Sequence, residues 1–299
     1  MAAIVVLLLV GIVLFSLNII SLPVQGGNAN VTQTPITTSP LNSTLTYAGV
    51  NITVLTAQKS DNFADDPNTK TDGMLRLNIQ EQNNLKETVS FLYSQSAHLV
   101  LPDGKVISPI YAKAKGGVAP GVTQKSFVDF AVPSSTKLSQ LTFRFGTEHE
   151  AQMDLPLSGN GQASLAKYQP KSGKLNGVAV AYLQQGLTYS VIGVTSSYSI
   201  PGKQADKGMH FLALDISVDN TLAQTAIPGS PFDYMRLKST NGLNAPVTTT
   251  LPISFAQGRH GTTGTVVFQA PLDSTTATLV LLAQPAEGID PSQVTFQLP

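Results

Sequence analysis

The strongest constraint on the fold is an internal repeat, because the second half of the chain carries the same segments as the first in the same order. The two copies are offset by about 140 residues. The matched segments are GMLRLNIQEQNN and GMHFLALDISVDN, LPDGKVISP and LKSTNGLNAP, FVDFAVP and VVFQAP, and Leu45-Thr46-Tyr47 and Leu187-Thr188-Tyr189. Each copy spans about 110 to 120 residues, which is the size of a β-sandwich with seven or more strands.

Within each copy, apolar side chains recur at every second position, which is the pattern of half-buried strands. Leu75, Leu77 and Ile79 alternate with polar residues, and the run from Leu141 to Phe145 follows the same period. Gly, Pro, Asn and Asp interrupt these runs as turn residues. Beyond residue 46 no segment keeps a helical period, so the sequence predicts antiparallel β-structure throughout.

The first 24 residues carry no ionisable side chain and are almost entirely apolar. An apolar helix of about twenty residues matches the roughly 30 Å hydrocarbon layer of a bilayer. Residues 1–24 therefore predict a retained transmembrane signal anchor. A cleaved signal peptide stays open as the alternative, with Gly26 and Ala29 as small residues for a peptidase, and cleavage would release the protein as a secreted one.

The residues after this segment predict the domain organisation. Residues 25–46 are an uncharged Thr/Ser/Asn/Pro-rich stretch, which is typical of an external tether. We expect β domains at 47–157 and 178–299, both extracytoplasmic, on a single-pass anchor in the cell membrane. The stretch 158–177 is expected to be a Gly/Ser/Lys linker. Its lysines (Lys167, Lys171 and Lys174) belong either to a solvated spacer or to a contact with an anionic polymer or lipid headgroups.

The order of motifs in each copy resembles that of a known family. An alternating strand ends in Asn (Asn83 or Asn84, and Asn220), a turn with Gly follows, and the first copy then has Pro120-Gly121 before a late strand ending in Pro133. This order resembles a family of bacterial extracytoplasmic immunoglobulin-like domains of mostly unknown function, sometimes labelled as similar to telomere-repeat-binding factors.

The resemblance covers both copies and implies an all-β fold class, with two tandem immunoglobulin-like β-sandwich domains behind one N-terminal transmembrane helix. It implies no catalytic residues. The second copy departs from the pattern, with Gln257-Gly258 where the first has Pro120-Gly121, and the chain lacks the lipid-accepting cysteine common in such proteins.

The composition excludes several kinds of site. Without cysteine the chain has no disulfide, zinc–thiolate site or thiol nucleophile. The formal net charge is zero, so no overall field attracts nucleic acid. The chain also lacks tryptophan, the main residue of sugar-binding platforms, although four tyrosines near the linker keep carbohydrate binding open: Tyr168, Tyr182, Tyr189 and Tyr198.

The loop DNFADDPNTKTD is the strongest candidate for a metal site. It offers carboxylate oxygens from Asp61, Asp65, Asp66 and Asp72, and an amide oxygen from Asn68. Calcium takes six to eight oxygen ligands from flexible loops, so the loop predicts a calcium site, with an ordinary solvated hairpin loop as the alternative. No other cofactor is expected.

The sequence predicts no catalytic site. Glu148-His149-Glu150 is the densest cluster of possible ligands, but on a strand the histidine would point away from the glutamates. We therefore expect a non-enzymatic, membrane-tethered binding or scaffold protein whose partner is a protein or an envelope polymer. The alternatives are an envelope sensor or accessory subunit of a membrane complex, and a calcium-stabilised adhesin-like module.

Overall fold

The computed structural model describes residues 35–66, 72–113, 117–159, 161–182, 186–282 and 291–299. The predicted membrane segment at 1–24 and the first part of the expected tether lie outside these ranges. Among the described residues, no helix is long and apolar enough to cross a membrane. Residues 35–299 form one compact unit.

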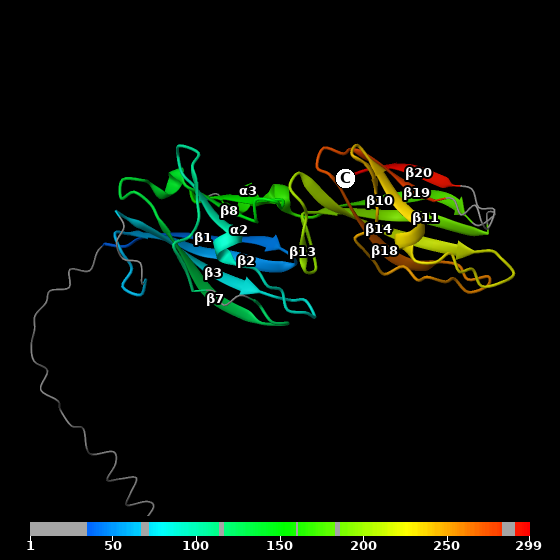
Figure 1. Ribbon diagram of the computed structural model, residues 1–299, viewed down its shortest axis with the longest axis horizontal. Coiled ribbons are helices and arrows are strands. Elements are labelled where there is room, and N and C mark those ends of the chain that lie inside the picture. The colour runs from blue at the N-terminus through cyan, green and yellow to red at the C-terminus, as the bar shows by residue number, and fades with distance from the viewer. Residues whose placement is uncertain (1–34, 67–71, 114–116, 160, 183–185, 283–290) are drawn as a thin grey trace, which may run out of the picture. The chain divides into compact units, whose positions relative to one another are not determined.

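The prediction of an all-β fold is confirmed, because antiparallel strands account for most of the described chain (Figure 1). We call residues 35–170 the first half and residues 171–299 the second half. The strands of the first half are β1 (Thr37–Tyr47), β2 (Val50–Ser60), β3 (Met74–Gln82), β4 (Ala97–Val100), β5 (Val106–Ile107), β6 (Tyr111–Ala112), β7 (Thr123–Ala131), β8 (Thr142–Phe145) and β9 (Met153–Pro156). Its short helices are α2 (Tyr93–Ser96), η1 (Leu138–Gln140), α3 (Gly161–Leu165) and η2 (Ala166–Tyr168).

The second half has the same succession of elements with one additional hairpin. Its strands are β10 (Lys171–Tyr182), β11 (Leu187–Ser197), β12 (Ser199–Ile200), β13 (Lys203–Gln204), β14 (Met209–Asn220), β15 (Met235–Ser239), β16 (Gly242–Asn244), β17 (Thr248–Thr249), β18 (Thr262–Pro271), β19 (Thr276–Leu281) and β20 (Ser292–Gln297). Its helix is α4 (Pro231–Tyr234). The additional hairpin is β12–β13, which lies in the connection between β11 and β14.

Sheet topology confirms that the second half repeats the first. The five-stranded sheet of the first half has the order β1-β2-β3-β7-β6, and that of the second half has the matching order β10-β11-β14-β18-β17. The four-stranded sheets β5-β4-β8-β9 and β16-β15-β19-β20 also correspond strand by strand. A β-bulge falls at the same place in both copies, between Val54 and Thr56 and between Val191 and Gly193.

Each half has its own core between its two sheets. In the first half, Leu77 of β3 and Phe130 of β7 pack with Phe143 of β8, and all three side chains are fully buried. In the second half, Leu214 of β14 and Leu279 of β19 are the corresponding buried residues. Burial on one face of every strand explains the alternation seen in the sequence.

Two expected loop segments contain regular structure. β1 begins at Thr37, so residues 37–46 of the expected tether form a strand, in which Leu41, Ser43 and Leu45 are buried. The expected linker 158–177 contains α3, η2 and the first residues of β10. The fully buried Leu165 of α3 packs into the core of the first half.

One of the predicted matches between the two copies was wrong. Leu45–Tyr47 lies on β1, whereas Leu187–Tyr189 lies on β11, which is the counterpart of β2. The three-residue motif fits any strand with a buried first and third position, so it is too short to fix the correspondence.

The strand-terminal asparagines make the same hydrogen bonds in both halves. Asn83, not Asn84, is the equivalent of Asn220, and both side chains are fully buried. Each Oδ1 accepts the backbone N–H two residues on, at 2.9 Å, as in an Asx turn. Each Nδ2 donates to the carbonyl four residues on and to a carbonyl before the last long strand of its sheet, that of Val118 or Phe255.

We predict that Asn83→Ala lowers the free energy of unfolding by about 3 kcal/mol, because it leaves buried backbone groups without partners. Asn84→Ala is the matched control, since Asn84 is exposed, and we expect a change within about 0.5 kcal/mol. Urea denaturation followed by circular dichroism measures both. Equal effects of the two substitutions would contradict a structural role for Asn83.

Candidate functional site

The connection between β11 and β14 is hydrogen bonded to two turns of the first half, and we call this set of contacts the joint. The backbone N–H of Gly49 donates to Ser199 Oγ at 2.7 Å, and that of Gly202 donates to the Ala48 carbonyl at 3.0 Å. Ala151 N–H donates to the Ala205 carbonyl at 2.7 Å. Most of these groups are main-chain atoms in turns, so the joint depends on the backbone fold of both halves.

Gln204 is the side chain that closes the joint. It is buried, its Nε2 donates to the Ala151 carbonyl at 2.8 Å, and its Oε1 accepts the Ala48 N–H at 3.4 Å. One amide therefore binds both turns of the first half. A small apolar cluster lies beside it and joins Ala151 of the first half to Ala205, Phe211 and Val267 of the second.

The Glu148-His149-Glu150 cluster lies in the turn before β9, at the joint, and not on a strand as predicted. Glu148 and His149 are exposed and contact each other, with His149 Nε2 at 3.2 Å from Glu148 Oε1. Glu150 Oε2 instead accepts hydrogen bonds from the Tyr47 hydroxyl at 2.8 Å and from the Thr147 N–H at 2.9 Å. Burial and the neighbouring Glu150 carboxylate raise the pKa of Tyr47, so this hydroxyl keeps its proton as a donor.

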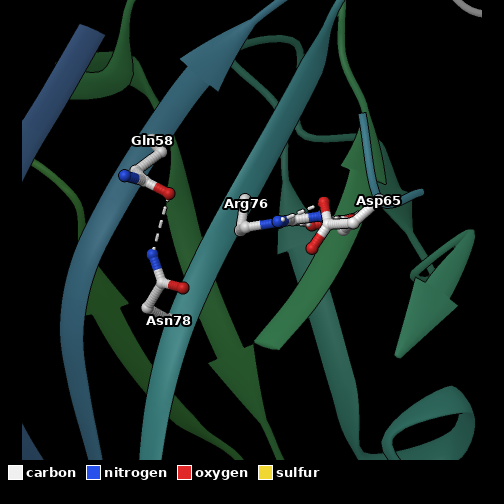
Figure 2. A network of polar contacts seen from close by, with 5 residues as sticks. Gln58, Asp65, Arg76 and Asn78 are labelled. Atoms are coloured by element: carbon white, nitrogen blue, oxygen red, sulfur yellow. Dashed lines mark hydrogen bonds and ion pairs between the residues drawn. The ribbon is translucent and has the colours of Figure 1, made fainter. Parts of the chain in front are cut away.

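The acidic loop covers a buried ion pair on the outer face of the first five-stranded sheet. Arg76 of β3 makes a bidentate pair with Asp129 of β7, with Nε–Oδ1 and Nη2–Oδ2 distances of 2.8 Å. Its Nη1 lies 2.7 Å from Asp65 Oδ1 of the loop, and Figure 2 shows Arg76 extending from β3 toward Asp65. The guanidinium also lies over two rings, 4.3 Å from the Phe63 centroid and 3.6 Å from that of Phe127.

Two carboxyl groups, those of Asp65 and Asp129, bind one guanidinium, and Asp66 lies next to Asp129. Burial raises the pKa of Asp129 to about 6, and the neighbouring Asp66 contributes, although the hydrogen bonds with Arg76 act in the opposite direction. Asp129 and Arg76 are both buried, while the side chain of Asp65 is more than half exposed. The effects of burial and of Asp66 outweigh that of Arg76, so protonation of the Asp129 carboxyl is favoured as the pH falls toward 6.

The other residues of the predicted calcium loop are Asp61, Asn68 and Asp72. Asp61 and Asp72 are exposed, and Asn68 lies outside the described residues. Asp65 binds Arg76, whose guanidinium competes with a cation for the Asp65 oxygens, and Asp66 lies next to Asp129. Among the described residues, no group of three acidic or histidine side chains is arranged to hold a metal ion. The calcium site therefore stays a prediction.

The same location in the second half carries apolar residues. Strand pairing places Ala213 and Val267 opposite each other on β14 and β18, as Arg76 and Asp129 are on β3 and β7. There the β11–β14 connection covers the sheet, as the acidic loop does in the first half. The two equivalent loops therefore have different roles: the acidic loop binds a buried ion pair, and the β11–β14 connection forms the joint.

The four tyrosines considered for carbohydrate binding fall into two groups. Tyr182 and Tyr189 are buried in the core of the second half, next to Tyr234, and do not form a surface platform. Tyr168 and Tyr198 are half-buried and pack edge to face, with ring centroids 5.3 Å apart.

Sequence reasoning did not find the partners of the buried charges. Asp129 follows Arg76 by more than fifty positions, and only the pairing of β3 with β7 brings them together. Glu81 faces the core of the first half and accepts hydrogen bonds from Tyr93, Gln124 and Ser126. The sequence does carry a signal for Glu81, because it occupies the next core-facing position after Leu77 and Ile79 on β3.

A comparison of the chain with protein-family models and with curated proteins finds no match.

The raised pKa of Asp129 predicts a pH dependence. An unfolded Asp has a pKa of about 3.9, so the native state binds this proton more tightly. The contribution of Asp129 to the free energy of unfolding is then largest below about pH 4 and is lost as the pH rises through 6. We expect the difference in free energy of unfolding between wild type and Asp129→Asn to decrease as the pH is raised from 4 to 7, measured by urea denaturation at each pH. A difference that is constant across this range would contradict the raised pKa.

Proposed function

We propose that the chain is a non-enzymatic, membrane-tethered scaffold protein, in which the joint fixes two immunoglobulin-like β-sandwiches as one extracytoplasmic unit for binding a protein or an envelope polymer. The joint is the observation that carries this proposal. A flexible pair of independent domains needs no hydrogen bonds between its turns, whereas here the Gln204 amide, the Ser199 hydroxyl and backbone pairs connect them.

The immunoglobulin-like assignment is supported by the two facing antiparallel sheets of each half and by their common strand order. The assignment of the N-terminal segment as a membrane anchor is supported by the uncharged apolar run at residues 1–24 and by the tether-like residues after it. The two halves are then placed outside the cytoplasm, where a chain without cysteine needs its cores rather than disulfides for stability.

The absence of catalysis in this proposal is supported by how the polar groups are engaged. Arg76 binds its own aspartates, and Glu150 binds Tyr47 and the turn that contains it. These groups hold loops in place, which is a structural role.

Membrane topology is tested by single cysteines, because the natural chain has none. Ser135→Cys in the first half and Thr240→Cys in the second are substitutions at exposed positions. In intact cells we expect both to react with a membrane-impermeant maleimide. Labelling that requires permeabilised cells would overturn the extracytoplasmic placement.

The joint is tested with spin labels on the same two cysteines. We expect a narrow distance distribution in double electron–electron resonance, and we expect Gln204→Ala to broaden it, because both turns lose their contact with the amide. Lys203→Ala is the matched control, since its side chain is exposed and adjacent. A broad distribution in the otherwise natural chain would contradict a scaffold of fixed geometry.

A further inference from the structure

A small cavity lies where the segment before β10 meets the second half. Its volume is about 110 Å³. We call it the anion pocket, and its polar lining comprises Lys167, Gln169, Lys171, Ser196, Tyr198, His210 and Ser274. Lys171, Ser196 and His210 lie on β10, β11 and β14, and Ser274 lies in the β18–β19 turn. Lys167 and Gln169 precede β10, and Tyr198 begins the β11–β14 connection.

Two residues that line the pocket each have a buried polar atom without a hydrogen-bond partner among the described residues: His210 Nε2 and Ser274 Oγ. The two residues are 7% and 8% exposed. A buried polar group left without a partner costs about 1–3 kcal/mol, so these atoms call for a water or a ligand.

The polar groups of the pocket can all act as donors. Ser196 Oγ lies 2.9 Å from His210 Nδ1, and when the hydroxyl donates, the neutral imidazole carries its hydrogen on Nε2. Burial lowers the pKa of His210, which favours this neutral ring. Ser274 adds a hydroxyl donor.

The charged side chains at the rim have one sign. Lys167 and Lys171 are exposed, and the described residues that line the cavity include no Asp or Glu, although Pro299, the last residue of the printed sequence, is among them. Ammonium groups beside buried N–H and O–H donors form a setting for an oxyanion, since charge-assisted hydrogen bonds are the stronger ones.

The first half provides an internal comparison. Strand pairing makes Lys59 of β2 the equivalent of Ser196, because Lys59 pairs with Leu75 and Ser196 pairs with Leu212. The Lys59 ammonium donates to the carbonyls of Ser134 and Thr136, in the turn that corresponds to the one containing Ser274. In the first half the Lys59 side chain occupies this position. In the second half the shorter Ser196 stands there beside His210, and a cavity remains.

We propose that the anion pocket binds a tetrahedral oxyanion, the phosphate group of a free ion or of a glycerophosphate lipid headgroup, through His210 Nε2, the Ser274 hydroxyl and the lysines at its rim. The proposal does not depend on the scaffold function, because the two side chains that bond the joint, Ser199 and Gln204, do not line the pocket. It would give the protein a ligand that the joint does not supply.

The first test is a phosphate titration of the full-length chain, observed by the long-range ¹⁵N–¹H correlations of the histidine rings. We expect phosphate to shift the Nε2 signal of His210 in a saturable way and to raise the midpoint of thermal unfolding. Absence of a His210 shift at millimolar phosphate would overturn the proposal and leave water as the occupant.

Matched variants identify the binding groups. Ser274→Ala and Lys171→Gln should each weaken phosphate binding about tenfold, the effect of losing roughly 1.4 kcal/mol of a charge-assisted contact. Lys174→Gln is the control, since Lys174 lies on the same strand but outside the lining of the pocket. Because Lys171 is exposed, its variant remains informative even if Ser274→Ala does not fold. Equal weakening by Lys174→Gln would indicate diffuse attraction to lysines and would contradict a built site.

A second arm distinguishes the source of the phosphate. The wild type and Ser274→Ala are compared for binding inorganic phosphate, glycerol phosphate and vesicles of phosphatidylglycerol. Vesicle binding that is reduced by Ser274→Ala assigns the pocket to a headgroup, and binding of the soluble ligands without vesicle binding assigns it to a free phosphate. Equal binding of all three by wild type and Ser274→Ala would overturn the site.

Discussion

Hydrogen bonds between turns connect the two halves of residues 35–299. The joint connects the β1–β2 turn and the turn before β9 to the β11–β14 connection, and the buried amide of Gln204 binds both turns. If the buried amide lost these partners, the loss of free energy would exceed what the hydrogen bonds contribute when formed. The joint therefore favours a single arrangement of the two halves. The scaffold function that we propose depends on this geometry.

Duplication gave the two copies the same hydrogen-bonded strand order but different chemistry at equivalent positions. Arg76 and Asp129 form a buried ion pair where Ala213 and Val267 contribute apolar surface. Arg76 has little freedom there, because Phe63 and Phe127 pack on its two sides. A buried charge needs partners, and Asp65 of the acidic loop is one of the partners of Arg76. The equivalent connection in the second half has no such charge beneath it and contacts the first half instead.

The sequence predicted what depends on local patterns. Alternation of Leu75, Leu77 and Ile79 predicted β3 and its buried face, and the repeat predicted a second copy of the same sheet. The asparagine at the end of β3 was recognised, although its pattern did not decide between Asn83 and Asn84, since only the buried one can bond the turn.

Contacts between residues far apart in the chain could not be predicted from the sequence. Nothing near Arg76 along the chain indicates Asp129, and the acidic loop was interpreted from its oxygens alone, without the guanidinium that binds Asp65. His210 and Ser274 drew no attention, because their significance depends on the space between them, which arises where the first half has Lys59. The C-terminal residues of the expected tether were also misjudged, since Leu41 and Leu45 are buried by the neighbouring strand and not by any local pattern.

Amide hydrogen exchange of the joint tests the central claim most directly. The N–H groups of Gly49, Ala151 and Gly202 lie in turns, where exchange is usually fast. If the joint is formed in solution, these amides are protected to an extent comparable with those of β2 and β14, and Gln204→Ala reduces their protection selectively. Fast exchange at all three amides in the natural chain, beside protected strands, would contradict a fixed joint and leave two sandwiches that move independently.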